Sequence, residues 1–200
     1  MNPDVVTYTT FLNILARSKD PNKVMIADAI LQKMESQLNE NPNMMPNNFT
    51  YDAILRTCAH PSTFDKQTLR RALILGVRTM SKFQESKSFQ PTSYSFNLFF
   101  SVLNRLSSGE EKKKLFTQTF SDCCKQGLLD GKTFESLKRN TDESLLQMLF
   151  DTDSIDNLEF SDLPDSWKCN IRTKSVASAS SLRFSERVVD NTGRRKLRQR

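Results

Sequence analysis

The sequence lacks the features of membrane-spanning and secreted proteins. No apolar run approaches the roughly 20 residues that a membrane-spanning helix needs. The N-terminus does not have the ordered charged, apolar and small-residue regions of a secretory signal. We therefore expect no membrane partner.

Residues that usually carry catalysis are also scarce. His60 is the only histidine, and it precedes a proline in an expected turn. The chain shows no paired nucleophile and base, and no glycine-rich loop that would cradle a phosphate. We therefore expect a protein that is not an enzyme, with no catalytic residues, no cofactor and no small-molecule substrate.

The cysteines likewise give no sign of a metal site or of disulfide bonds. The spacing of the four cysteines fits neither a metal site nor a disulfide framework: Cys58, Cys123, Cys124 and Cys169. We interpret the adjacent pair as reduced packing residues of an intracellular protein, and we predict no metal site. One alternative stays open, because Asp151, Asp153 and Asp156 resemble the acidic clusters of metal-dependent nucleases.

Charge is divided unevenly along the chain. Residues 1–140 hold 19 Lys or Arg and 13 Asp or Glu, whereas residues 141–167 hold eight acids and no base. Residues 168–200 hold ten bases and two acids. The basic end could contact RNA phosphates or serve as a nuclear localisation signal. Its composition predicts a disordered tail from residue 172 onward. Mild positive charge suits a polyanion, although many soluble proteins share it.

A motif recurs along the chain. Residues 46–55 read Pro-Asn-Asn-Phe-Thr-Tyr-Asp-Ala-Ile-Leu, and the same pattern returns at 3–12, at 91–100 and, more weakly, at 129–137. Its aromatic residue steps by 43, 45 and 38 positions, through Tyr8, Tyr51, Phe96 and Phe134. A period in this range is typical of stacked helical repeats.

Apolar spacing, caps and breakers predict helices throughout and no strand. The expected helices, in chain order, cover about residues 4–18, 20–38, 49–59, 65–86, 92–106, 110–126, 130–139 and 142–150. They form antiparallel pairs in an all-α solenoid, with repeats at 3–45, 46–90, 91–128 and 129–150. Residues 151–171 are expected to cap the last repeat, with Trp167 as the anchor.

The motif resembles the pentatricopeptide repeat, the unit of a family of single-stranded RNA-binding proteins. The resemblance is carried by Pro-Asp-Val-Val-Thr-Tyr-Thr at residues 3–9 and by residues 46–55, then by the pattern of 91–100 and loosely by 129–137. It covers residues 3 to about 150, with repeats longer than the family's usual ones. The resemblance implies a right-handed superhelix that acts in organellar RNA processing, stabilisation or translation.

The same resemblance implies a mitochondrial or plastid location, although the sequence itself shows no compartment. Met1 lies two residues before a repeat boundary. This is what a C-terminal portion of a longer protein would look like, and a targeting segment would then be missing.

In that family two side chains from successive repeats read one base. Carried over to this chain, the pairs are Thr9 with Asn47, Asp52 with Thr92, and Asn97 with Asp130. The first pair resembles an adenine-reading pair and the third a uracil-reading pair, while the second matches no common pair. Short polar side chains can hydrogen-bond a splayed base edge. The residues expected to flank the bases are Val6, Phe49, Tyr94 and Lys132.

Simpler interpretations stand beside these assignments. Helix capping alone would explain Asn47, Thr92 and Asp130, and Phe49 and Tyr94 would be packing residues if they were half-buried. The rival functions are a protein–protein scaffold whose groove holds a peptide, and the RNA-binding arm of an RNase P-like enzyme whose nuclease domain lies outside this chain.

Overall fold

The computed structural model describes residues 3–86, 88–105 and 109–171. These residues form α-helices and short 3₁₀ helices and contain no strand, which confirms the all-α class. The basic tail predicted at residues 172–200 lies outside the described residues. The α-helices are α1 (Val5–Arg17), α2 (Lys23–Ser36), α3 (Asn48–Ala59), α4 (Lys66–Glu85), α5 (Ser93–Leu103), α6 (Glu110–Lys125), α7 (Gly131–Asn140) and α8 (Glu143–Phe150).

Two predicted boundaries differ from the structure by three residues. The second helix begins at Lys23 rather than at Asp20, because the Asp20 carboxylate accepts the Asn22 amide at 2.7 Å and closes a separate turn. The fifth helix ends at Leu103, where Asn104 is the C-cap. The connection at 39–46 also contains one 3₁₀ turn, Pro42–Met44.

The first helix of each pair starts with the same capping arrangement. Four side chains accept a hydrogen bond from the backbone amide three residues later: those of Asp4, Asn47, Thr92 and Asp130. In α3 and α5 the N3 hydroxyl accepts a second hydrogen bond, from the capping residue's own backbone amide, which completes a capping box. The polar residue that follows the proline of the motif is therefore a helix N-cap.

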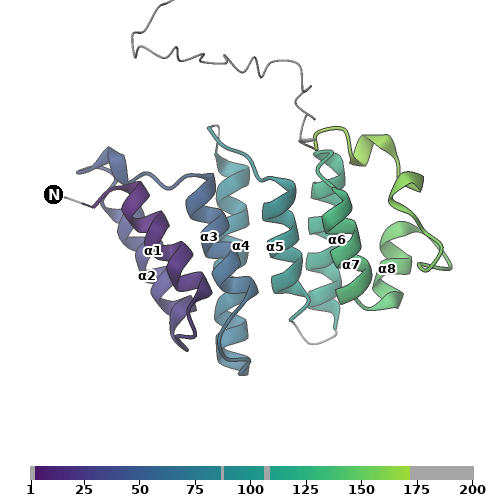
Figure 1. Cartoon of the computed structure of the whole chain (residues 1–200), viewed down its shortest axis with the longest axis horizontal. Coiled ribbons are helices and arrows are strands. Elements are labelled where there is room, and N and C mark those ends of the chain that lie inside the picture. The colour runs from purple at the N-terminus through teal and green to yellow at the C-terminus, as the bar shows by residue number, and fades with distance from the viewer. Residues whose placement is uncertain (1–2, 87, 106–108, 172–200) are drawn as a thin grey trace, which may run out of the picture.

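The helices lie side by side along the long axis of the molecule (Figure 1). The first helices pack in succession, α1 on α3, α3 on α5 and α5 on α7, while α2 contacts α4 and α6 contacts α8. Each pair also packs internally, as α1 does with α2 and α3 with α4. The first helices thus form one row in which equivalent positions of the motif are neighbours.

The motif aromatics build the core between the helices. Phe96 and Phe134 are fully buried, and Tyr51 lies 5.4 Å from Phe83 between ring centroids. Tyr8 is only half-buried, because α1 lies at the end of the row. Burial of these rings supplies much of the hydrophobic stabilisation that holds neighbouring helices together.

Close packing explains the glycine inside α4. A Cβ atom at Gly76 would lie 3.2 Å from the Phe99 ring and 3.6 Å from a Val102 methyl group, both on α5. Helix α5 therefore packs on α4 as well as on α3. A glycine at this position lets the two helices approach more closely than an alanine would allow without adjustment.

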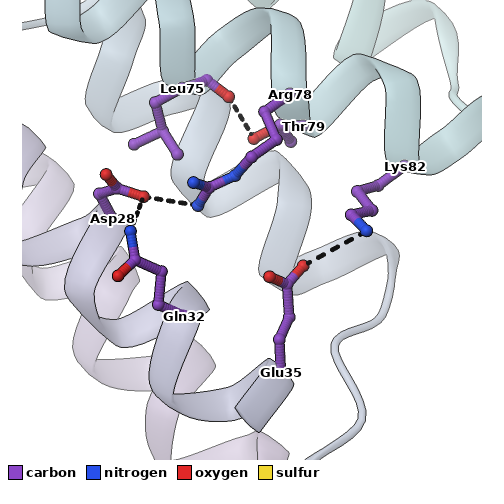
Figure 2. Close-up of polar contacts among 7 residues, drawn as sticks. All are labelled: Asp28, Gln32, Glu35, Leu75, Arg78, Thr79 and Lys82. Atoms are coloured by element: carbon purple, nitrogen blue, oxygen red, sulfur yellow. Dashed lines mark hydrogen bonds and ion pairs between the residues drawn. The ribbon is translucent and has the colours of Figure 1, made fainter.

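Ion pairs join the second helices on the other side of the molecule. Figure 2 shows Arg78 and Lys82 of α4 reaching Asp28 and Glu35 of α2. The Asp28 carboxylate also accepts from Gln32 on its own helix, at 3.3 Å. These contacts are partly exposed, so they order the α2–α4 packing more than they stabilise it.

Residues 151–171 cover the far end of the row, against α6, α7 and α8. The Leu129 amide donates to the Trp167 carbonyl at 2.9 Å, and the Trp167 ring lies 5.5 Å from Phe120 between centroids. Ile155 and Leu163 are buried in the same core. The segment therefore gives an otherwise apolar end of the row an acidic outer surface.

Candidate nucleic-acid interface

The structure places the predicted base-reading residues at equivalent positions on neighbouring helices. Thr9, Asp52 and Asn97 each lie five residues after the N-cap of their helix, on α1, α3 and α5. All three are half-buried. Because these helices pack in succession, the three side chains form a polar line across the row.

The first predicted pair is joined by a hydroxyl group. The Thr9 hydroxyl lies 2.7 Å from the Thr50 hydroxyl across the α1–α3 contact. Thr50 in turn donates to the Asn47 side-chain oxygen at 3.3 Å. Thr9 and Asn47, which are far apart in sequence, are therefore members of one hydrogen-bonded cluster.

The second pair is joined in the same way, one helix further along. The Ser95 hydroxyl donates to the Asp52 carboxylate at 2.6 Å, across the α3–α5 contact. Its oxygen lies 3.1 Å from the Thr92 hydroxyl. The N3 hydroxyl of each following helix therefore connects the two residues that the repeat pattern pairs.

The third pair does not repeat this arrangement. The Thr133 hydroxyl donates to the Ser93 carbonyl at 3.4 Å instead of turning toward Asn97. Among the residues that the structure describes, no hydrogen bond links the Asn97 amide to Asp130, whose carboxylate caps α7. Within the described residues the third pair is therefore not joined by a hydroxyl group, unlike the first two.

The four flanking residues differ in their surroundings. Phe49 is 74% exposed, and Val6 and Lys132 are also exposed. Tyr94 is 42% exposed, and its hydroxyl accepts a hydrogen bond from Arg56 at 2.8 Å. Phe49 is therefore not a half-buried packing residue, whereas Tyr94 has a role in helix packing.

Sequence reasoning missed Arg56, which lies one turn beyond Asp52 on α3. Its guanidinium donates to the Asn13 side chain of α1 at 3.1 Å and to Tyr94 of α5, whose ring centroid is 5.5 Å away. One cation thus spans three first helices beside the polar line. Helical spacing could have found it, because Arg56 follows Asp52 by four residues as Asn13 follows Thr9.

The surroundings of Asp52 perturb its pKa. Burial raises the pKa of Asp52 above its usual 3.8, while the hydrogen bond from Ser95 and the charge of Arg56 oppose that rise. A carboxylate in this position costs free energy to ionise. It also places a negative charge next to a surface that would have to accept RNA phosphates.

Asp52→Asn is expected to stabilise the fold relative to wild type, increasingly so at higher pH. A raised pKa in the folded state means that protonated Asp52 favours folding at low pH, and that this stabilisation is lost as pH rises through the folded pKa. The amide keeps an oxygen that can accept from Ser95 and does not ionise. Urea unfolding of both proteins from pH 4 to 7 checks this. The contributions of the other titrating groups cancel when the two free energies of unfolding are subtracted. A difference that shrinks with rising pH would contradict the assignment.

Three predicted site residues line one depression of the surface. Thr92, Tyr94 and Asp130 border it together with Asn48 and Asn170, and its volume is about 590 Å³. It opens beside the N-terminal ends of α5 and α7, where Ile171 ends the described chain. The N-terminal ends of the first helices and the capping segment therefore share one surface.

The described residues offer no metal site. They contain no group of three or more His, Cys, Asp or Glu side chains that could hold an ion, and Asp151, Asp153 and Asp156 are exposed on the capping segment. Burial raises the pKa of the Cys124 thiol to about 12 and also raises that of Cys58 and Cys123. None of the described helices is long and apolar enough to span a membrane.

Comparisons with protein-family models, with curated proteins and with solved structures each found no match.

Proposed function

We propose that this chain is a right-handed α-solenoid of pentatricopeptide-like repeats that binds single-stranded RNA along its first helices. In this proposal the repeats are residues 3–45, 46–90, 91–128 and 129–150, and residues 151–171 cap the last one. Equivalent motif positions on α1, α3 and α5 lie in register and support this division.

The observation that carries the proposal is the pairing of the polar residues. Thr9 with Asn47 and Asp52 with Thr92 are each held together by the hydroxyl of the next first helix. Two successive contacts therefore present a pair of short polar side chains, which is the arrangement that reads one base per repeat. A groove built for an apolar peptide would not need polar clusters at these positions.

Exposed aromatic rings next to the polar line add to this argument. Phe49 lies three residues before Asp52 and Tyr94 three residues before Asn97, so each ring precedes a polar residue by about one helical turn. Stacking of a base on an aromatic side chain is worth about 1–3 kcal/mol. The surface thus offers stacking and base-edge contacts in alternation.

The expected affinity is modest. Base stacking on Phe49 and Tyr94, worth about 1–3 kcal/mol for each ring, barely offsets an association cost of about 4–15 kcal/mol. Attraction between phosphates and the basic residues after 171 would add affinity only at low salt. We infer a contribution to organellar RNA processing, stabilisation or translation, in which additional surface from a longer chain, a protein partner or a second copy strengthens binding.

Electrophoretic binding to random single-stranded and double-stranded RNA over a salt series tests the proposal. We expect preference for single strands, and we expect Thr9→Ala combined with Asn97→Ala to weaken binding about tenfold, since each lost hydrogen bond is worth about 0.5–1.5 kcal/mol. A matched control is Thr117→Ala with Gln67→Ala, which changes an exposed hydroxyl and an exposed amide on α6 and α4.

Three outcomes would contradict base reading. Equal binding to both kinds of RNA, abolished by deleting residues 172–200, would reduce the interaction to the charge of the basic end. Equal weakening by the control variant would show that the polar line has no special role. Absence of RNA binding at low salt would favour the protein-scaffold function instead.

A further inference from the structure

Arginine side chains on the two sides of the helix row have different partners. Among the second helices, Arg78 pairs with Asp28, as Figure 2 shows, and Arg70 pairs with Glu111. On the first helix α3, Arg56 has no carboxylate within ion-pair distance among the described residues. The positive charge of Arg56 is therefore not neutralised by a direct ion pair.

Neutral side chains hold the Arg56 guanidinium in place. Its Nε donates to the Tyr94 hydroxyl at 2.8 Å, and its Nη1 donates to the Asn13 side-chain oxygen at 3.1 Å. The other terminal nitrogen, Nη2, makes no hydrogen bond within the described residues and remains accessible at the surface. A guanidinium with a fixed orientation and an unused N–H group is suited to bind a phosphate oxygen.

The guanidinium borders the polar line of the first helices. Arg56 lies one turn beyond Asp52 on α3, and its partner Asn13 lies one turn beyond Thr9 on α1. A strand whose base edges meet the polar line has its sugar–phosphate backbone along one border of that line. Arg56 lies on such a border and supplies a charge that opposes the repulsion between the Asp52 carboxylate and a phosphate.

Other cations lie close to this position. His60 follows Arg56 by one turn, and its pKa is lowered by burial and then by the charges of Arg105, Lys23 and Arg56. Arg105 and Lys23 donate to backbone carbonyls at the ends of α3 and α1 rather than to acids. The surroundings of Arg56 therefore carry several positive charges without paired carboxylates, which favours a polyanion.

We propose that Arg56 binds a phosphate of the RNA strand, with its guanidinium donating to a phosphodiester oxygen beside the base that lies at Asp52. This inference rests on the proposed RNA-binding function and adds to it a contact that carries no sequence information. Asn13 and the Tyr94 ring still hold the guanidinium when the Tyr94 hydroxyl is removed. The contact therefore depends mainly on the charge of Arg56.

Fluorescence anisotropy with single-stranded poly(A), poly(U) and poly(C), at salt concentrations from about 50 to 200 mM, tests the proposal. Arg56→Gln is expected to weaken binding of all three RNAs by the same factor, about tenfold at the lowest salt. It is also expected to lower the slope of log Kd against log salt concentration by about 0.7, the value for one phosphate contact on a single strand. Arg56→Lys keeps the charge and is expected to retain the slope.

The matched control is Arg70→Gln, which makes the same change at an exposed position of α4 and is expected to leave the slope unchanged. Thermal unfolding followed by circular dichroism establishes that the variants are folded. An unchanged slope in Arg56→Gln would overturn the proposal, as would a slope in Arg56→Lys that falls as far as in Arg56→Gln. Weakening confined to one RNA would assign Arg56 to a base instead, and an equal fall in the control would leave only net charge.

Failure of this inference can be told apart from failure of the proposed function. If the wild type binds single-stranded and double-stranded RNA equally, base reading is contradicted. The slope of Arg56→Gln then still tests the phosphate contact, with an expected change of about 0.9 on a double strand. If the wild type prefers single strands and the slope is unchanged in Arg56→Gln, only the role of Arg56 is wrong. Absence of RNA binding by the wild type at low salt would overturn both.

Discussion

Phe134→Ala is expected to lower the free energy of unfolding by about 3–5 kcal/mol, the usual cost of removing a buried aromatic side chain. Phe134 is 0% exposed, and its ring packs against Phe150 of α8 at 5.6 Å and Phe160 of the capping segment at 6.0 Å between centroids. Alanine would leave a cavity where three elements meet. Urea unfolding of the wild type and the variant gives the difference directly.

Phe49→Ala provides the matched control, because it removes the same side chain from the surface of another first helix. Phe49 is 74% exposed, so its truncation is expected to change stability by no more than about 0.5 kcal/mol. Comparable losses from the two variants would mean that the motif aromatic does not hold the row together. The assignment of Phe134 to the core and Phe49 to the surface would then be wrong.

The sequence predicted the helices well because the signals for them are local. A capping residue, a Ser or Thr and an aromatic recur at the start of each first helix, and Asn47 and Thr92 cap their helices as expected. The burial of Tyr51 was also predicted, since the motif aromatic falls on the apolar face of the helix, whereas the exposure of Phe49 was left open. Asp20 was placed wrongly, because a cap and a turn use the same residue types.

Contacts between the first helices could not be predicted in the same way. The Thr50 and Ser95 hydroxyls join the predicted pairs only because α1, α3 and α5 pack at a particular distance and rotation. The link from Arg56 to Asn13 and Tyr94 depends on the same geometry. Sequence spacing fixes which face of a helix a residue occupies, whereas the partner on the next helix is decided by packing.

Tertiary packing also separates two aromatic residues that the motif treats as equivalent. Phe49 and Tyr94 occupy the same position on α3 and α5, yet only Tyr94 accepts a hydrogen bond and packs beside a guanidinium. Phe49 has no such contact among the described residues. The Tyr94 ring is therefore oriented by Arg56, whereas none of the described contacts orients the Phe49 ring in this way.

Phe49→Ala is therefore expected to weaken binding of single-stranded RNA by about 5- to 150-fold, the equivalent of a stacking contribution of about 1–3 kcal/mol. Tyr94→Phe separates stacking from packing at the next helix, because it keeps the ring and removes only the hydroxyl that accepts from Arg56. We expect Tyr94→Phe to retain nearly all of the affinity and Tyr94→Ala to lose about as much as Phe49→Ala. Fluorescence anisotropy with a labelled single-stranded RNA at fixed low salt measures all three.

The control for these variants is Phe64→Ala, which removes another exposed ring from the connection between α3 and α4. The centroid of this ring lies 5.0 Å from the Arg105 guanidinium. Its loss should leave RNA binding unchanged, because Phe64 lies outside the first helices. If Phe64→Ala weakens binding as much as Phe49→Ala, the RNA contacts exposed rings without regard to position. If Tyr94→Phe weakens it as much as Tyr94→Ala, the hydroxyl that orders Arg56 matters more than the ring, and the RNA contact at α5 is polar rather than a stacking contact.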